Sequence, residues 1–247
     1  MIITPNWPVP SNIRAAISCR DGGVSQGVYT SWNMGTHVSD DPAVVESNRK
    51  KLIEQLALQK SPQWLEQVHG NKIVESQADG RVRTADACFT QEKGLACVVM
   101  TADCLPVLIC DKQGTQVAAV HCGWRSLAQS ILEKTLNNFT QPSDLLVYLG
   151  PAISKQHFEV GVDVLEAFFQ SSKSALHTDH IADAFTPGKR PLHFYADIYA
   201  LARAELQALG VTQIFGGDYC TFEQRDKFYS YRRDGVTGRM ASLIWLL

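Results

Sequence analysis

Two short stretches of this chain concentrate side chains that can do chemistry. They are Thr101-Ala102-Asp103-Cys104-Leu105-Pro106 and Ala119-Val120-His121-Cys122-Gly123-Trp124-Arg125. A thiol such as Cys104 becomes a nucleophile or a metal ligand once it loses its proton, and a neighbouring imidazole such as His121 favours that loss. The two stretches therefore predict a reactive pair, Cys104 and His121, provided that the fold brings them together.

The segment between the two stretches predicts a β-hairpin that does so. Residues 107–111 and 116–120 are apolar and β-prone, and a short polar loop with a glycine separates them. This pattern is typical of two antiparallel strands with a tight connection. Pairing the ends of that loop places His121 opposite Pro106, at the open end of the hairpin, with Cys104 just beyond it. Proline is tolerated at the first residue of a strand, where no ladder donor is needed.

Three interpretations of Cys104 and His121 follow from their chemistry. They can form a Cys–His nucleophile pair that attacks a carbonyl. They can also bind a metal, because catalytic zinc takes three protein ligands and leaves a fourth position open. His69 is the natural third ligand, since it ends a predicted strand next to a glycine, although His37 and His157 remain alternatives from the residues alone. The third interpretation is packing at a hairpin end.

Copper is a further possibility, because two histidines and a cysteine are also the ligand set of blue-copper sites. A complete multicopper oxidase, however, needs many paired histidines for its oxygen-reducing cluster. This chain has 7 histidines and no His-x-His pair. The histidine content therefore disfavours copper.

The composition excludes several classes of partner. The 247 residues are 45% hydrophobic and 19% charged, with a formal net charge of −2 and no basic block, which disfavours nucleic acid and anionic membranes as partners. No apolar run is long enough to span a bilayer, and residues 1–5 lack the features of a signal peptide. The 7 cysteines, an odd number without framework spacing, predict reduced thiols in the cytoplasm. Four of them lie in apolar surroundings and are expected to be buried: Cys19, Cys88, Cys97 and Cys110.

Strands and helices alternate along the chain, which favours one α/β domain over residues 1–247. Asp41 and Pro42 predict a helix start, and that helix is expected to run to about Ala57. Further helices are expected at Ser126–Phe139, Val162–Phe169 and His193–Leu209. Strands are expected at Ile13–Ser18, Trp64–Gly70, 84–90, 94–101, Leu145–Leu149 and Val211–Phe215, with a second hairpin formed by Phe228–Arg233 and Met240–Leu247.

Six motifs, in order, carry a resemblance to a known family. Besides the two stretches above, they are Leu65-Glu66-Gln67-Val68-His69-Gly70, Leu149-Gly150-Pro151-Ala152-Ile153, Phe158-Glu159-Val160-Gly161, and Tyr229-Ser230-Tyr231-Arg232-Arg233-Asp234 with Gly238-Arg239-Met240. Together they resemble the YfiH family, formerly regarded as polyphenol oxidases or laccases and now as purine nucleoside phosphorylases. The match runs from Arg20 to the C-terminus. Cys122 departs from the pattern, since many relatives have alanine there.

The resemblance implies a fold, a metal and an activity. The fold would be a three-layer α/β/α sandwich with mixed sheets, similar to cysteine hydrolases of the cytotoxic necrotizing factor type. His69, Cys104 and His121 would be zinc ligands. The reaction would be phosphorolysis of adenosine, inosine, guanosine or methylthioadenosine, with deamination of adenosine as a side activity. Some relatives are linked instead to peptidoglycan editing, an amidase-type role.

Phosphorolysis also requires a site for the phosphate anion. Arg49, on the first long helix, and Asn33 are the predicted phosphate or substrate contacts, because a guanidinium donates two parallel hydrogen bonds to such an anion. Arg20 or Arg125 could replace either. The expected partners are thus a purine nucleoside and phosphate, and the expected assembly is a monomer or a homodimer.

Overall fold

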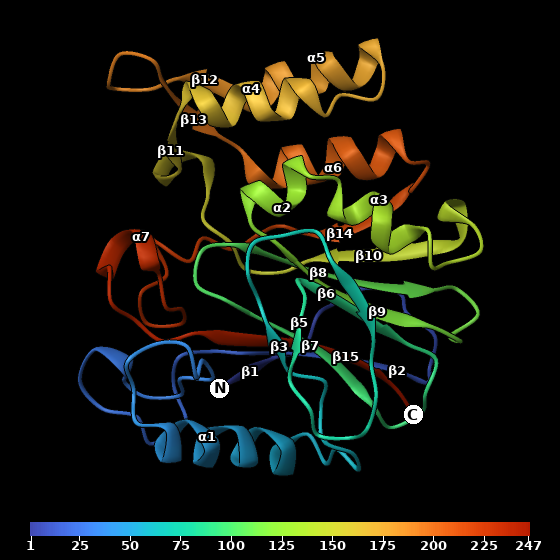
Figure 1. Cartoon of the computed structure of the whole chain (residues 1–247), viewed down its shortest axis with the longest axis vertical. Coiled ribbons are helices and arrows are strands. Elements are labelled where there is room, and N and C mark those ends of the chain that lie inside the picture. Colours follow the sequence, from blue (N-terminus) through green and yellow to red (C-terminus); the bar gives the residue numbers. More distant parts are fainter.

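The β region contains two main sheets packed face to face, as seen in a computed structural model that describes residues 1–247 (Figure 1). The larger has the order β14-β10-β8-β9-β6-β4, formed by Gln213–Gly216, Leu145–Leu149, Leu105–Asp111, Val117–Cys122, Ala87–Thr90 and Ile73–Glu75. The smaller has the order β1-β2-β15-β7, formed by Ile2–Ile3, Ile13–Ser18, Met240–Leu246 and Ala96–Thr101. Two minor sheets are β11-β13-β12 (Glu159–Gly161, His193–Ala196, Phe185–Pro187) and β3-β5 (Leu65–Glu66, Arg83–Thr84). Parallel and antiparallel pairs coexist in the larger sheet, which is therefore mixed.

Helices cover both outer faces of this β region (Figure 1). Helix α1 (Pro42–Gln55) packs on the smaller sheet, and α2 (Trp124–Ala128), α3 (Ile131–Leu136) and α6 (Ile198–Ala208) lie over the larger one, with α4 (Val162–Gln170) and α5 (Ala175–Ala184) beyond them. The short α7 (Tyr231–Asp234) and three 3₁₀ turns (Gly27–Tyr29, Pro142–Asp144, Lys155–His157) complete the chain. The predicted α/β sandwich with mixed sheets is confirmed, and its β layer consists of two sheets. None of the helices has the length and apolar composition needed to traverse a bilayer.

The apolar face between the two sheets forms one of the hydrophobic cores. Val99 and Ile244 from the smaller sheet meet Leu108 and Tyr148 from the larger one, and all four are buried. Full burial of an aliphatic side chain of this size stabilises a fold by roughly 1.5–3 kcal/mol. The larger sheet is thus held rigidly on both faces, and it carries the candidate site at one end of β8 and β9.

The predicted hairpin is confirmed with its register. Strands β8 and β9 pair antiparallel with Pro106 opposite His121 and Leu105 opposite Cys122. Cys104 therefore lies just outside the first residue of β8, as the sequence pattern predicts. The predicted helix start is also confirmed: the Asp41 side chain accepts a hydrogen bond from the Ala43 amide, and Pro42 is the first helical residue.

One predicted helix is partly wrong. Residues 193–196 form β13, which pairs with β11 and β12, and only residues 198–208 are helical. Asp197 separates the two elements, because its side chain caps α6 by accepting a hydrogen bond from the Ala200 amide. The preceding aromatic pair, Phe194 and Tyr195, suits a strand better than a helix.

The predicted C-terminal hairpin is wrong. Strand β15 pairs with β2 on one side and with β7 on the other, so no edge remains for residues 228–233. Residues 231–234 form the single-turn α7 instead, and the Ser230 hydroxyl caps it by accepting a hydrogen bond from the Arg233 amide. Pairing with distant strands has overridden the local pattern.

Three other predicted elements differ in their bounds. The strand expected at 64–70 is regular only at Leu65–Glu66. The helix expected at 126–139 is divided into α2 and α3, because Ser130 adopts a left-handed backbone conformation with φ of 59°. The last strand of the larger sheet, expected at 211–215, covers residues 213–216.

Candidate active site and metal centre

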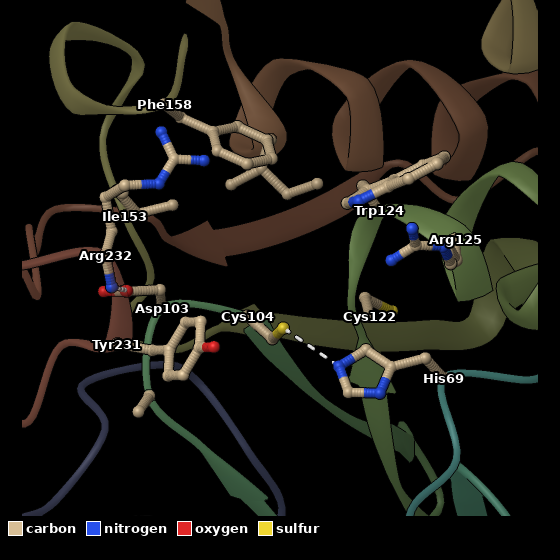
Figure 2. A pocket seen from close by; sticks show the side chains of 12 residues that line it. His69, Asp103, Cys104, Cys122, Trp124, Arg125, Ile153, Phe158, Tyr231 and Arg232 are labelled. Carbon is tan, nitrogen blue, oxygen red and sulfur yellow. Dashed lines mark hydrogen bonds between the residues drawn. The ribbon is translucent and has the colours of Figure 1, made fainter. Parts of the chain in front are cut away.

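The structure brings His69, Cys104 and His121 together. Their ligand atoms all lie within 4.8 Å of one another, and the Cys104 Sγ is 3.8 Å from the His69 Nε2. The two imidazoles meet edge to face with their centroids 4.8 Å apart. Figure 2 shows the Cys104 sulfur pointing at the His69 ring. Of the alternatives to His69, His37 lines a cavity together with the three donors but is not in their ligand group, and His157 belongs to a different cluster.

Asp86 connects the two histidines. One of its carboxylate oxygens lies 2.9 Å from the His121 Nδ1, and the same carboxylate accepts hydrogen bonds from the backbone amides of Val68, His69 and Gly70. Asp86 is fully buried, at the residue before β6. Because Asp86 occupies the Nδ1 of His121, the Nε2 of that ring is left to face the site. Residues 68–70 turn away from a strand geometry because their amides bind this carboxylate, and His69 has φ of 57°.

Gly123 leaves the space in which the three side chains meet. A Cβ atom at this position would lie 3.0 Å from His69 Cδ2, 3.3 Å from Cys104 Sγ and 3.5 Å from His121 Cε1. A Cβ there would crowd His69 and Cys104 and would reach ordinary van der Waals contact with His121. The absence of a side chain at Gly123 therefore belongs to the geometry of the site.

The site is electrostatically coupled. Burial alone would raise the pKa of the Cys104 thiol, but the imidazoles of His121 and His69 outweigh burial and lower it to about 6. Burial likewise disfavours a charged His121, but the Cys104 thiolate and the Asp86 carboxylate raise its pKa to about 9. At neutral pH the metal-free site is therefore a thiolate–imidazolium pair, and the thiolate is the form that attacks an electrophile or binds a metal.

Asp103 anchors the backbone beside Cys104 to the C-terminal part of the chain. It has φ of 88°, and its carboxylate accepts hydrogen bonds from the hydroxyls of Thr221 and Ser230 and from the Arg232 amide. These contacts dock α7 next to the site, so that Tyr231 borders it (Figure 2). Residues more than 100 positions apart in sequence thus share one wall.

Two cavities meet at the three donors. The first, of about 230 Å³, is here called the aromatic cavity, because Trp124, Phe158 and Tyr231 line it together with Ile153, Ile198 and Arg232 (Figure 2). The second, of about 390 Å³, is called the cationic cavity, because Arg239 and the imidazole of His121 line it, with His37 beside them. His69, Ala102, Cys104 and Tyr231 belong to both. A ligand that spans the two would pass directly over Cys104.

Arg239 is the guanidinium that lines the cationic cavity. Arg239 forms no ion pair with a carboxylate, and its guanidinium donates only to the backbone oxygens of Thr237 and Gly238. Burial lowers the pKa of Arg239, and burial together with the charges of Arg239 and Arg49 lowers the pKa of His37 to about 4. The guanidinium of Arg239 therefore remains available to pair with an anion.

The predicted substrate contacts, Arg49 and Asn33, do not line either cavity. Arg49 is only 6% exposed, stacks on the Trp64 ring at 3.8 Å and donates to the Met34 carbonyl and to the Met100 sulfur. It lies behind Met100, which lines the cationic cavity. Asn33 is fully buried, and its side-chain oxygen accepts a hydrogen bond from the Arg239 amide at 2.9 Å. Both residues thus support the cavity wall from behind.

Sequence reasoning missed Asp86 and Arg239. Asp86 is a single acid before an apolar strand, and only the pairing of β6 with β9 brings it to His121. Arg239 lies in the Gly238-Arg239-Met240 motif that carries the family resemblance, so that motif was the available signal.

Comparison with known proteins supports a common family. The family model described as multi-copper polyphenol oxidoreductase laccase matches residues 14–247. A purine nucleoside phosphorylase of Pseudomonas aeruginosa is 50% identical over 99% of this chain and 98% of its own length, and the purine nucleoside phosphorylase YfiH of Shigella flexneri is 47% identical over 100% and 99%. The crystal structure of the Neisseria meningitidis protein NMB0706 superimposes with a TM-score of 0.93 at 47% identity, covering 99% of this chain and 98% of that one. With the fold and the full-length matches in agreement, this chain belongs to the family described as multi-copper polyphenol oxidoreductase laccases, which includes the YfiH proteins.

Proposed function

We propose that this chain is a zinc-dependent purine nucleoside phosphorylase with one catalytic domain over residues 1–247. Its substrates would be adenosine, inosine, guanosine or methylthioadenosine together with phosphate, and adenosine deamination would be a side activity. The observation that carries the proposal is the meeting of an aromatic and a cationic cavity at Cys104. The names of the relatives, purine nucleoside phosphorylases at up to 50% identity, agree with it.

The donor set at the junction fits zinc. A tetrahedral zinc ion with a thiolate and imidazole ligands holds its sulfur and nitrogen donors about 3.5 Å apart, and Cys104 Sγ and His69 Nε2 are already 3.8 Å apart. The carboxylate on the far nitrogen of His121 is the usual partner of a metal-binding histidine. Bound there, zinc would supply Lewis acidity and positive charge.

Copper fits the same position less well. Blue-copper sites add a weak axial methionine to two histidines and a cysteine. Met100 is the one methionine that lines either cavity, and its sulfur accepts a hydrogen bond from Arg49. The sulfur is therefore engaged away from the donors, which favours zinc over copper and disfavours polyphenol oxidation.

The aromatic cavity suits a purine base. Flat heteroaromatic rings bind best between apolar and aromatic side chains with a few polar groups at the edge. Trp124 and Phe158 provide these surfaces, and Arg232 lies at the rim with its guanidinium 5.5 Å from the Phe158 ring. A base held there would direct its ribose toward Cys104 and the cationic cavity.

The cationic cavity suits phosphate. Arg239 lines it directly, and Arg49 adds positive charge from behind Met100. Phosphate held by Arg239 would attack the anomeric carbon as the bond from that carbon to the purine nitrogen breaks. The products would be ribose 1-phosphate and the free base, which takes up a proton. In this scheme Asn33 acts by positioning Arg239.

The first test is the phosphate requirement. With inosine as substrate, ribose 1-phosphate should form only when phosphate is supplied, and free ribose released at an equal rate without phosphate would exclude phosphorolysis. Arg239→Gln should raise the KM for phosphate about tenfold to a hundredfold, because a hydrogen bond to a charged group contributes about 1.5–3 kcal/mol. The KM for inosine should change little. Arg81→Gln, at an arginine whose side chain is 84% exposed, is the matched control.

A Cys–His hydrolase acting on amide bonds, as in peptidoglycan editing, is the second candidate. The lowered pKa of Cys104 and the Asp86–His121 contact favour it. Cys104 would be the nucleophile, His121 the base and Asp86 the carboxylate that orients the base. The two candidates differ in their response to metal removal. A zinc enzyme loses activity on chelation and regains it with zinc, whereas a Cys–His hydrolase stays active. Full activity of the metal-free protein would therefore support the hydrolase.

A further inference from the structure

A second group of metal-binding side chains lies outside this site. The ligand atoms of His157, Cys220 and Glu223 are all within 4.8 Å of one another. Cys220 is 6% exposed, His157 is half-buried, and Glu223 is exposed although its carboxylate reaches the His157 ring. None of these residues belongs to either cavity described above.

The backbone holds this second group in place. Cys220 forms a bridge with Ala152, and the next amide, that of Thr221, donates to the Ala152 carbonyl at 3.0 Å. The His157 ring stacks on Phe222 with the two rings only 14° from parallel and 4.2 Å apart. The imidazole and the thiol therefore keep their positions without a ligand.

The three donors are those that zinc prefers: a sulfur, an imidazole nitrogen and a carboxylate oxygen. In the structure His157 Nε2 and Glu223 Oε1 are 2.8 Å apart, whereas tetrahedral zinc would separate a nitrogen and an oxygen ligand by about 3.4 Å. The Glu223 side chain is 58% exposed, so it is free to withdraw by this small amount. The Ser154 hydroxyl donates to the Cys220 sulfur at 3.0 Å, as a group that supports a thiolate ligand would.

We propose that His157, Cys220 and Glu223 form a second site for a divalent zinc-like cation, with the fourth position open to solvent. The backbone around His157 connects this site to the wall of the aromatic cavity. His157 directly precedes Phe158, and the Arg232 guanidinium donates to the carbonyls of His157 and Glu159. Both Phe158 and Arg232 line the aromatic cavity, so a cation on His157 holds that wall in its observed position.

The test uses cobalt(II) as a probe, because a thiolate ligand to cobalt produces a near-ultraviolet charge-transfer band. Metal-free Cys104→Ser, which lacks the thiolate of the first site, should still show this band with about one cobalt bound through Cys220. The band should disappear in Cys104→Ser/Cys220→Ser. Glu223→Gln in the same background should weaken cobalt and zinc binding at least about tenfold. His180→Ala, at a histidine of α5 that belongs to neither group of metal-binding side chains, should leave both unchanged.

Two results would overturn the second site. One is the absence of a thiolate–cobalt band in folded Cys104→Ser, and the other is unchanged cobalt affinity after Glu223→Gln. Because Glu223 is exposed, that variant decides the question even if the Cys220 variant fails to fold. Zinc should also slow amide hydrogen exchange in residues 155–159 of Cys104→Ser. Unchanged amide exchange would contradict the proposal that a cation on His157 fixes the wall of the aromatic cavity. These readouts do not depend on nucleoside cleavage, so the phosphorylase proposal can fail while the second site stands.

Discussion

At the scale of single residues, Asp86 is the side chain on which the geometry of the site depends most. Its carboxylate holds the His121 ring from one side and the backbone of residues 68–70 from the other. An asparagine at this position would turn an NH₂ group toward backbone N–H groups that now donate hydrogen bonds to Asp86, so donor would face donor. It would also lack the charge that favours protonation of His121.

Asp86→Asn should therefore bind zinc roughly 10- to 100-fold more weakly than the wild type, the usual cost of losing a carboxylate behind a metal-binding histidine. Competition with a chromogenic chelator measures this affinity. Asp111→Asn, at a buried acid in the hairpin turn that binds the Thr115 amide, should lower stability without changing zinc affinity. Equal zinc affinity in Asp86→Asn and the wild type would remove Asp86 from the metal site.

The coupled titration of Cys104 and His121 belongs to the same scale. The folded pKa of Cys104 lies below its ordinary value of 9.0, so its contribution to stability is present above pH 9 and is lost as the pH falls through about 6. The folded pKa of His121 lies above its ordinary value of 6.5, so its contribution is present below that value and is lost as the pH rises through about 9. Both side chains are charged between these limits.

In the metal-free protein the alkylation rate of Cys104 by iodoacetamide should thus show its inflection near pH 6. His121→Gln should move the inflection upward, because it removes the imidazole that lowers the pKa of Cys104 most. The measurement is made in a Cys122→Ala background, since Cys122 borders the aromatic cavity, although burial raises its pKa well above the ordinary value. An inflection near pH 9 would show that Cys104 is not held as a thiolate. With zinc bound, alkylation should be slow.

At the scale of elements, the site depends on the connection between β9 and α2, which is the single residue Gly123. Gly123 caps α2 with φ of −59°, a value that alanine also adopts, so Gly123→Ala carries no backbone penalty of its own. The added Cβ would instead meet His69 at 3.0 Å and Cys104 at 3.3 Å. The effect of this substitution should therefore fall on the donors and not on the helix.

Gly123→Ala should lower zinc affinity at least about tenfold while circular dichroism and the thermal midpoint of the metal-free protein change little. Ser126→Ala in the same helix is the control, because its buried hydroxyl has no hydrogen-bond partner and it should leave zinc affinity unchanged. Wild-type zinc affinity in Gly123→Ala would mean that the three donors do not need the observed spacing.

At the scale of the whole molecule, a metal would connect segments that lie far apart in the chain. His69 follows β3, Cys104 precedes β8 and His121 is the last residue but one of β9. A cation that binds only the folded arrangement stabilises it by about 4 kcal/mol when its concentration is about 1,000 times the Kd. For a chain of this size that corresponds to a rise of roughly 8–16 °C in the thermal midpoint.

Chelation should thus lower the thermal midpoint of the zinc-loaded protein by several degrees, and added zinc should restore it, as measured by scanning calorimetry. Cys104→Ser should retain only the part of the shift that comes from His157, Cys220 and Glu223. Cys104→Ser/Cys220→Ser should show no shift. If neither chelator nor zinc changes the thermal midpoint of the wild type, metal does not contribute to the stability of the fold.

The sequence by itself determined the elements whose causes are local. The hairpin and its register follow from an apolar alternation interrupted by one short loop, and this register alone places Cys104 beside His121. The start of α1 follows from Asp41 and Pro42, which act within one helical turn. The ends of β10 follow from a short buried apolar run at 145–149. The choice of His69 over His37 and His157, in contrast, rests on the family resemblance.

Only the tertiary structure decided how distant segments meet. It placed β15 between β2 and β7, where the local pattern favoured a hairpin with residues 228–233. It brought Asp86 to both histidines, and it set Arg239 and Tyr231 around Cys104. The physical reason is common to these cases. Such contacts depend on the order of strands in the sheets and on which buried polar groups pair with each other. Neither can be predicted from a single stretch of residues.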